Sequence, residues 1–240
     1  MIYGNHIIIY CAANLQRLKF ASTFETHCLN MRYLVSFKPL NINRYGRKAI
    51  ENFGLPLYVD GSCRREPDFE SKFPSISALC RFTKFAPHLN EGDTVVYITV
   101  KGKYNPFSYR HWRLVAILKI LKRFDSHRDA AEWYTAQKIP LPSNCVVDGN
   151  PPLSLEKTTG LMPSTCCVWD SIYRKRAREC GVFLVCEPQF IELHQPPVLT
   201  EKVMREIFGK VPATQNPPKV SEAEFAQLQK VTRIQSLMNS

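Results

Sequence analysis

Two runs of β-branched and aliphatic residues, Thr94–Val100 and Leu114–Leu121, most constrain what this chain can fold into. Residues of this kind favour extended strands, and the Lys101–Arg113 segment between them predicts a hairpin connection. Weaker strand patterns occur at Tyr33–Phe37, Leu55–Val59, Val182–Cys186 and Phe190–Leu193. The last two are expected to form a closing hairpin, and the whole pattern predicts a mainly antiparallel sheet.

Helix signals fall between these strands. A helix around Arg47–Glu51 should end at Gly54, because glycine readily adopts the left-handed conformation that terminates helices. Ser126 opens a Ser-x-x-Asp capping box ahead of a helix over Arg128–Gln137. Strands with short helices between them are typical of the α+β class.

The C-terminal part has a different character. The proline-rich stretch Ile139–Pro163 predicts a loop, and a basic helix capped by Asp170 or Ser171 should follow it. Beyond Pro196-Pro197, capping residues at Thr200 and Ser221 predict two further helices. The expected organisation is an N-terminal extension over 1–30, with an alternative start at Met31, an α+β core over 31–195 and a helical tail over 196–240.

The charge of the chain indicates a polyanionic partner. The net charge is +11 and the pI is about 9.3, so nucleic acid is the leading partner and an anionic membrane surface the second. No apolar run is long enough for a membrane-spanning helix. The nine cysteines show neither Cys-x-x-Cys pairs nor a disulfide rhythm, which favours a reducing, cytoplasmic setting. No metal-ligand spacing or phosphate-binding glycine loop occurs, so no metal or cofactor is expected, and nothing specifies an oligomeric state.

The segment Cys63–Glu70 is unusually rich in charged residues that could form a catalytic or binding site. It holds two arginines and three carboxylates directly after a predicted turn at Asp60-Gly61. Arginines bind phosphate in a planar fork, and carboxylates do acid, base or electrostatic work. The candidate catalytic groups are Asp60 from the turn and Glu66 and Asp68 from the segment. Arg64 and Arg65 are the candidate ligands of phosphate or sugar. The alternative is a surface cluster of ion pairs.

Two basic segments are candidates for nucleic-acid contact. Lys101–Arg123 carries seven positive charges and no carboxylate, with aromatic residues interleaved. Aromatic faces stack on bases while cations hold phosphates; the alternative is a hairpin whose rings pack on the sheet. The candidates are Lys101, Lys103, Tyr104, Arg110, His111, Trp112 and Arg113. Arg174 and Arg178 share one face of the later basic helix and form the second candidate.

A catalytic cysteine is a further alternative. Cys145 could act as a nucleophile with His127 or His111 as its base, although nothing in its local sequence supports this. The neighbouring Asn144 is a candidate hydrogen-bonding group near a ligand.

Several short motifs resemble those of known domains. The strand entry Gly92-Asp93-Thr94-Val95 and the return strand Arg113–Ile120, followed by Trp133-Tyr134, resemble PUA-like and EVE-like barrels. The order of Asp60, Pro74-Ser75-Ile76 and Cys80-Arg81 is similar to the nucleotide-modification-associated domains of phages and bacteria. The resemblance covers about residues 31–160. It implies a small barrel that accepts a flipped or modified base, with a pocket near Asp60–Arg81 and Arg81 among the nucleic-acid ligands.

Three functions follow as hypotheses. The first is a DNA glycosylase that excises a modified base in defence against phages, because a carboxylate can support the cation-like sugar of the transition state. The second is a non-catalytic reader of modified DNA or RNA. The third is a structural protein whose basic face meets RNA or a protein partner. The charged Arg64–Glu70 segment favours the first, since a reader would need mainly aromatic residues.

Overall fold

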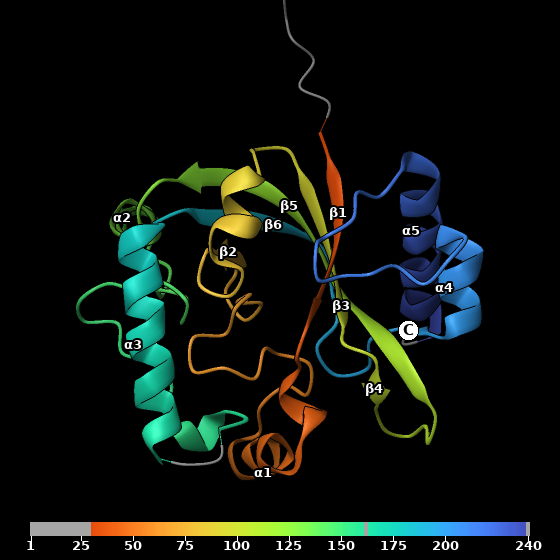
Figure 1. The fold of residues 1–240 in the computed structure, drawn as a ribbon, viewed down its shortest axis with the longest axis horizontal. Coiled ribbons are helices and arrows are strands. Elements are labelled where there is room, and N and C mark those ends of the chain that lie inside the picture. The colour runs from red at the N-terminus through yellow and green to blue at the C-terminus, as the bar shows by residue number, and fades with distance from the viewer. Residues whose placement is uncertain (1–29, 161–162, 239–240) are drawn as a thin grey trace, which may run out of the picture.

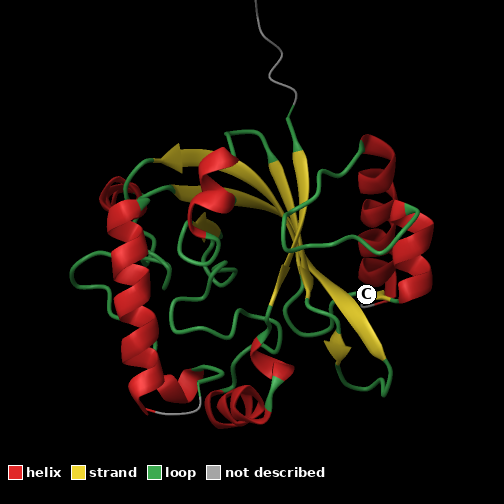
Figure 2. Ribbon diagram, viewed as in Figure 1, coloured by secondary structure: helices red, strands yellow, loops and turns green. Residues whose placement is uncertain are grey.

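The chain folds around one strongly twisted sheet, with helices on both sides of it (Figures 1 and 2). The computed structural model describes residues 30–160 and 163–238, so the predicted extension lies outside the described residues except for Asn30. The strands are β1 (Arg32–Phe37), β2 (Ser75–Ser77), β3 (Thr94–Thr99), β4 (Gly102–Lys103), β5 (Arg110–Phe124), β6 (Phe183–Ile191) and β7 (Val198–Leu199). The helices are α1 (Arg44–Phe53), α2 (His127–Ala136), α3 (Pro163–Glu179), α4 (Glu201–Phe208) and α5 (Glu222–Met238).

The predicted α+β class is confirmed. The strand order is β1-β3-β5-β6-β2, with β4 and β7 pairing separately with β5. Only β1 and β3 run parallel, and every other named pair is antiparallel. The path of paired strands therefore begins at β1 and ends at β2 (Figure 1).

Several local signals act as predicted. Ser126 accepts a hydrogen bond from the Asp129 amide at 3.0 Å, and Gly54 ends α1 with φ of 61°. In the capping box of α5, the Ser221 amide donates to Glu224 at 2.7 Å, and the Glu224 amide donates to the Ser221 hydroxyl at 3.3 Å.

Three expected elements were wrong. Leu55–Val59 forms turns rather than a strand, although Tyr58 and Val59 still make main-chain hydrogen bonds to Leu193 and Leu40. The expected closing hairpin is one continuous strand, β6, in which Pro188 lies opposite Leu118 where the register with β5 shifts. A bulge tolerates proline, so Pro188 does not mark a turn. Helix α3 begins at Pro163, ahead of the predicted caps.

The sheet separates two hydrophobic clusters. Helices α4 and α5 cover one face, where Met204, Phe225 and Leu228 pack with Leu34 and Val96. These helices and α3 lie on opposite sides of the sheet (Figure 1). On the other face, residues from the irregular 57–89 stretch pack on the sheet together with aromatic side chains of β1 and β3. Residues of that stretch line the site described next together with residues of β1, β3 and α3.

Within residues 30–160 and 163–238, no helix has the length and apolar character needed to cross a membrane.

Candidate functional site

A pocket of about 590 Å³ lies between the two end strands of the sheet. Strand β1 contributes Ser36 and Phe37, and β2 contributes Ile76 and Ser77. The 60–67 loop, β3 and α3 line the rest of the pocket. The lining side chains that matter most are Asp60, Glu66, Tyr97, Arg81, Trp169 and Tyr173. The pocket therefore combines aromatic walls with two carboxyl groups. Its volume lies within the range of small-molecule sites.

Asp60 enters the pocket from a loop held against the end of β1. Its main chain forms an isolated bridge with Pro39, and Gly61 donates to the Lys38 carbonyl at 3.1 Å. One carboxylate oxygen accepts from the Ser62 amide at 2.9 Å and from the Ser62 hydroxyl at 2.6 Å. Burial raises the pKa of Asp60, while the bonds from Ser62 and the charge of Arg65 act in the opposite direction.

Glu66 is the second carboxyl group of the pocket. It accepts hydrogen bonds from the Ser77 amide at 2.9 Å, from the Asn144 side chain at 3.0 Å and from the Ser77 hydroxyl. Asn144 is itself held by the Ser75 hydroxyl at 2.7 Å. Burial raises the pKa of Glu66 to about 8, and the negative charge of Asp60 acts in the same direction. Glu66 is therefore mostly protonated at neutral pH.

Asp68, the third candidate carboxylate, is buried outside the pocket lining. It accepts from the amide and the hydroxyl of Ser143, both at 2.8 Å, and from the Glu70 amide at 3.0 Å. Its main chain pairs with that of Ser75. Asp68 therefore braces the loop against the 142–150 segment, while Asp60 and Glu66 share the pocket.

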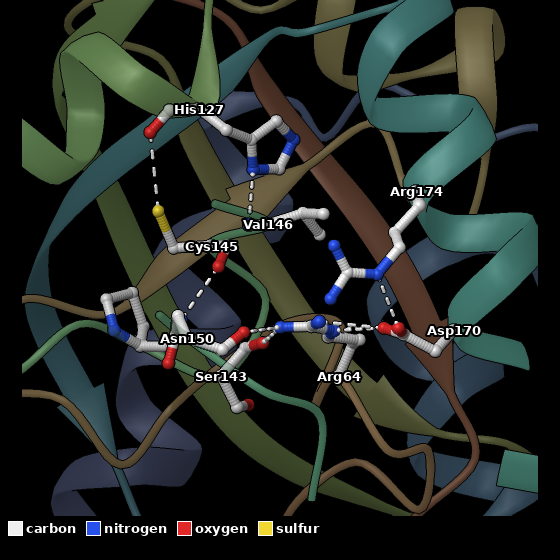
Figure 3. A network of polar contacts seen from close by, with 9 residues as sticks. Arg64, His127, Ser143, Cys145, Val146, Asn150, Asp170 and Arg174 are labelled. Atoms are coloured by element: carbon white, nitrogen blue, oxygen red, sulfur yellow. Dashed lines mark hydrogen bonds and ion pairs between the residues drawn. The ribbon is translucent and has the colours of Figure 1, made fainter. Parts of the chain in front are cut away.

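Arg64 lies at the centre of a buried polar network (Figure 3). Its guanidinium pairs with Asp170 at 2.7 Å and donates to the carbonyl oxygens of Ser143 and Asn150 at 3.2 and 2.8 Å. Arg174 pairs with the other oxygen of Asp170 at 2.7 Å. The donors of Arg64 are used inside the protein, where they tie α3 to the 142–150 loop.

Arg65 is also buried, with 1% of its surface exposed. It donates to the main-chain carbonyls of Asp60 and Lys157, and its Nε lies 3.5 Å from Glu70. These contacts hold the loop that presents Asp60. Arg64 and Arg65 thus lie behind the pocket wall, where their guanidinium groups contact other parts of the protein and not a ligand at the surface.

The geometry does not support the cysteine alternative. The Cys145 sulfur contacts the main-chain carbonyl of His127 at 3.4 Å, while the imidazole Nδ1 accepts from the Val146 amide at 3.0 Å (Figure 3). Burial raises the pKa of Cys145 to about 12 and lowers that of His127 to about 4. The thiol therefore has neither a base beside it nor a tendency to ionise.

The basic hairpin divides into buried and exposed residues. Tyr104, His111, Trp112 and Arg113 are buried. Arg113 donates to the carbonyls of Pro196 and Asn105, both at 2.9 Å, so its donors are used within the fold. Lys103 and Arg110 are exposed, and so are two of the interleaved aromatic residues, Phe107 and Tyr109.

The other predicted basic residues are dispersed. Lys101 pairs with Glu201 at 2.8 Å and lies 4.8 Å from the centre of the Trp112 ring. Arg178 is exposed on α3. Arg81 lines the pocket and donates to the Gln215 and Ser36 carbonyls at 2.5 and 3.1 Å. Of the predicted nucleic-acid ligands, only Arg81 lies with Asp60 and Glu66 in the pocket.

Sequence reasoning missed the aromatic walls. Phe37 and Tyr97 pack edge to face, with ring centroids 6.2 Å apart, and both line the pocket. They lie in strand patterns that predict core packing, and only the curl of the sheet brings them to a cavity. Gln215, from the linker between α4 and α5, has no sequence signal at all. Among the residues that the structure describes, no group of three metal-binding side chains could hold an ion.

Comparison with known proteins finds one distantly similar structure and no related sequence. No protein-family model matches the chain, and no curated protein matches it in sequence. Among solved structures, the crystal structure of ASCH from Zymomonas mobilis matches with a TM-score of 0.36 at 8% sequence identity, over 84% of this chain and 95% of that chain. A likeness this distant supports no argument about fold or function.

Proposed function

We propose that the protein binds nucleic acid and takes a single base, in modified form, into the pocket between β1 and β2 without cleaving it. The observation that carries this proposal is the pocket itself. Its aromatic walls suit a planar ring, and Asp60 and Glu66 provide hydrogen-bonding groups for the edge of that ring. The net charge of +11 supplies the attraction for a polyanion.

The state of the carboxyl groups favours binding over catalysis. A carboxylate that stabilises a sugar cation must be ionised when the base leaves. Of the two acids in the pocket, Glu66 is mostly protonated at neutral pH and therefore does not supply such an anion. Their hydrogen bonds to Ser62 and Ser77 also hold them in fixed positions, as recognition requires.

Base excision remains the second candidate, because one observation favours it. Two buried carboxyl groups with raised pKa values in one pocket are a pattern of acid–base sites. In this version Asp60 supports the sugar cation, Glu66 donates a proton to the departing base, and the setting is defence against phages with modified genomes.

One experiment separates these functions. Purified protein is incubated with unmodified DNA and with heavily modified phage DNA, and is then assayed by mobility shift and by gel after alkali treatment. A reader retards modified DNA and leaves it intact. Strand breaks that need alkali, and that occur only in modified DNA, support excision.

Asp60→Asn and Asp68→Asn form a matched pair of variants for this assay. Both remove a buried carboxylate, but only Asp60 lines the pocket. We expect Asp60→Asn to weaken the binding of modified DNA about tenfold or more, since a hydrogen bond to a charged group contributes about 1.5–3 kcal/mol. Asp68→Asn should retain binding, provided that thermal melting shows it folded. Equal binding by the two variants would remove the pocket from the proposal.

A further inference from the structure

Tyr97 of β3 is almost completely buried, yet it lines the pocket. Only 3% of its surface is exposed. The rings of Phe37 and Phe69 pack edge to face against its ring, with centroids 6.2 and 5.4 Å away. These aromatic contacts restrict the ring and therefore the place of its hydroxyl group.

The sheet is irregular at the same residue. The register between β3 and β5 shifts between Tyr97 and Ile98, because β5 has one extra residue there. Such β-bulges are over-represented next to active sites, where they change the direction of a side chain. The irregularity therefore lies where β3 borders the pocket.

The other buried tyrosines of the described chain place their hydroxyl groups beside polar groups of the protein. Tyr104 and Tyr134 donate to main-chain carbonyl oxygens, both at 2.7 Å. Polar side chains lie beside the hydroxyls of Tyr58 and Tyr173 as well. This pattern is expected, because a buried hydroxyl without a partner is costly.

The Tyr97 hydroxyl has no hydrogen-bond partner among residues 30–160 and 163–238. Its oxygen is also not one of the fully enclosed polar atoms of those residues that lack a partner, so it is open to the pocket space. The ionisable groups that act on it include Glu66, Arg81 and Cys80, and all three line the pocket. Burial raises the pKa of Tyr97 well above its usual value, so the hydroxyl keeps its proton.

We infer that the Tyr97 hydroxyl is a ligand-binding group, which forms a hydrogen bond with a polar atom of the inserted base. Phenylalanine would pack in the same aromatic cluster without the cost of an unpaired hydroxyl, so packing alone does not require tyrosine here. A ligand that supplies the missing partner offsets that cost. This inference rests on the proposed base-binding function.

The test compares the binding of modified and unmodified DNA by the full chain. Heavily modified phage DNA and unmodified DNA are denatured, sheared to the same length and used to displace a fluorescein-labelled oligonucleotide, with anisotropy as the readout. We expect Tyr97→Phe to bind modified DNA about 3- to 10-fold more weakly than wild type, as the loss of one neutral hydrogen bond implies. Its affinity for unmodified DNA should stay the same, because the attraction of phosphates does not involve this hydroxyl.

Tyr134→Phe is the matched control. It removes a hydroxyl that is also buried, but that is bonded within the protein and lies outside the pocket lining. We expect this variant to lower the Tm by about 2–4 °C and to keep the wild-type preference for modified DNA. Tyr97→Phe should show the opposite pattern, with weaker binding of modified DNA and no fall in Tm.

The outcomes distinguish this inference from the function on which it rests. A wild type that prefers modified DNA, with the same preference in Tyr97→Phe, overturns the inference and leaves the base pocket standing. An equal loss of affinity for both DNAs, or a fall in Tm as large as that of Tyr134→Phe, gives the hydroxyl a structural role and also overturns the inference. A wild type without any preference overturns the base-binding function itself, and the inference with it.

Discussion

Glu66 and Asp68 are two residues apart, yet their side chains have different surroundings. Glu66 meets Ser77 and Asn144 at the pocket, whereas Asp68 meets Ser143 away from it. Burial raises the pKa of Glu66 to about 8. The same residue that shapes the pocket therefore also makes the stability of the fold depend on pH.

The pH dependence has a defined sign. A carboxyl group whose pKa is raised in the folded state contributes stability that is complete below its ordinary pKa of 4.5 and is lost as the pH rises towards 8. His127, with its pKa lowered to about 4, acts oppositely, but only below its ordinary value of 6.5. Between pH 6.5 and 8, Glu66 makes the larger contribution of these two groups, because the unfolded His127 loses only its last half proton there.

We expect the free energy of unfolding to fall by about 1 to 1.5 kcal/mol between pH 6.5 and 8, and Glu66→Gln to abolish most of that fall. Urea unfolding at the two pH values measures the difference. Asp68→Asn should keep the wild-type slope. An identical slope in wild type and Glu66→Gln would mean that Glu66 is ionised in the folded protein at pH 6.5.

At the scale of elements, α1 packs unusually closely on the preceding 3₁₀ turn, η1 (Leu40–Ile42). A Cβ atom added at Gly46 would lie 1.6 Å from the Leu40 carbonyl oxygen. Since backbone atoms cannot yield as a flexible side chain can, only glycine fits this contact. The close approach fixes α1 beside the loop that leads to Asp60.

Gly46→Ala should therefore cost about 3 kcal/mol, the upper range for overpacking a well-packed site. Gly54→Ala is the control, because φ of 61° strains the backbone there while nothing lies within 4 Å of the added atom. That substitution should cost about 1 kcal/mol. Chemical denaturation of both variants measures the difference, and equal losses would show that α1 shifts to accommodate the methyl group.

On the scale of the whole molecule, the net charge of +11 accounts for the non-specific part of the nucleic-acid binding that we propose. The exposed residues Lys103 and Arg110 lie beside the exposed rings of Phe107 and Tyr109, at one end of β5. The buried arginines Arg64, Arg65 and Arg113 contribute to the field but direct their donors inward. We therefore propose that Lys103 and Arg110 make the phosphate contacts.

Replacement of both Lys103 and Arg110 by alanine should reduce the slope of log affinity against log salt by about 1 to 2, because each phosphate contact contributes about 0.7–0.9. Anisotropy titrations over a range of salt concentrations measure this slope. The control replaces Lys122 and Arg128, which are also exposed and carry the same charge. Equal slopes in the two double variants would mean that the hairpin contributes only general charge.

The division of the chain at residue 195 stays a prediction. Helices α4 and α5 pack directly on the sheet, where Met204, Phe225 and Leu228 share a cluster with residues of β1 and β3. The linker between the helices also supplies Gln215 to the pocket wall. The tail therefore takes part in both the core and the site.

The sequence by itself determined the elements whose signals are local. The β-branched runs of β3 and β5, the cap at Ser126 and the stop at Gly54 act over a few residues, so they appear in the structure as predicted. Pro188 shows where local reasoning fails. Proline normally marks the end of a strand, but the bulge opposite Leu118 accommodates it within β6.

Only the tertiary structure decided which charged residues face the pocket. Asp60, Glu66 and Asp68 look equivalent in sequence, and so do Arg64 and Arg81. Long-range partners separate them, because Asp170 holds Arg64 in the interior, Ser143 holds Asp68 and the Gln215 carbonyl holds Arg81 at the pocket wall. Residue type and spacing specify the available chemistry, whereas burial and pairing across the fold determine where a ligand can meet it.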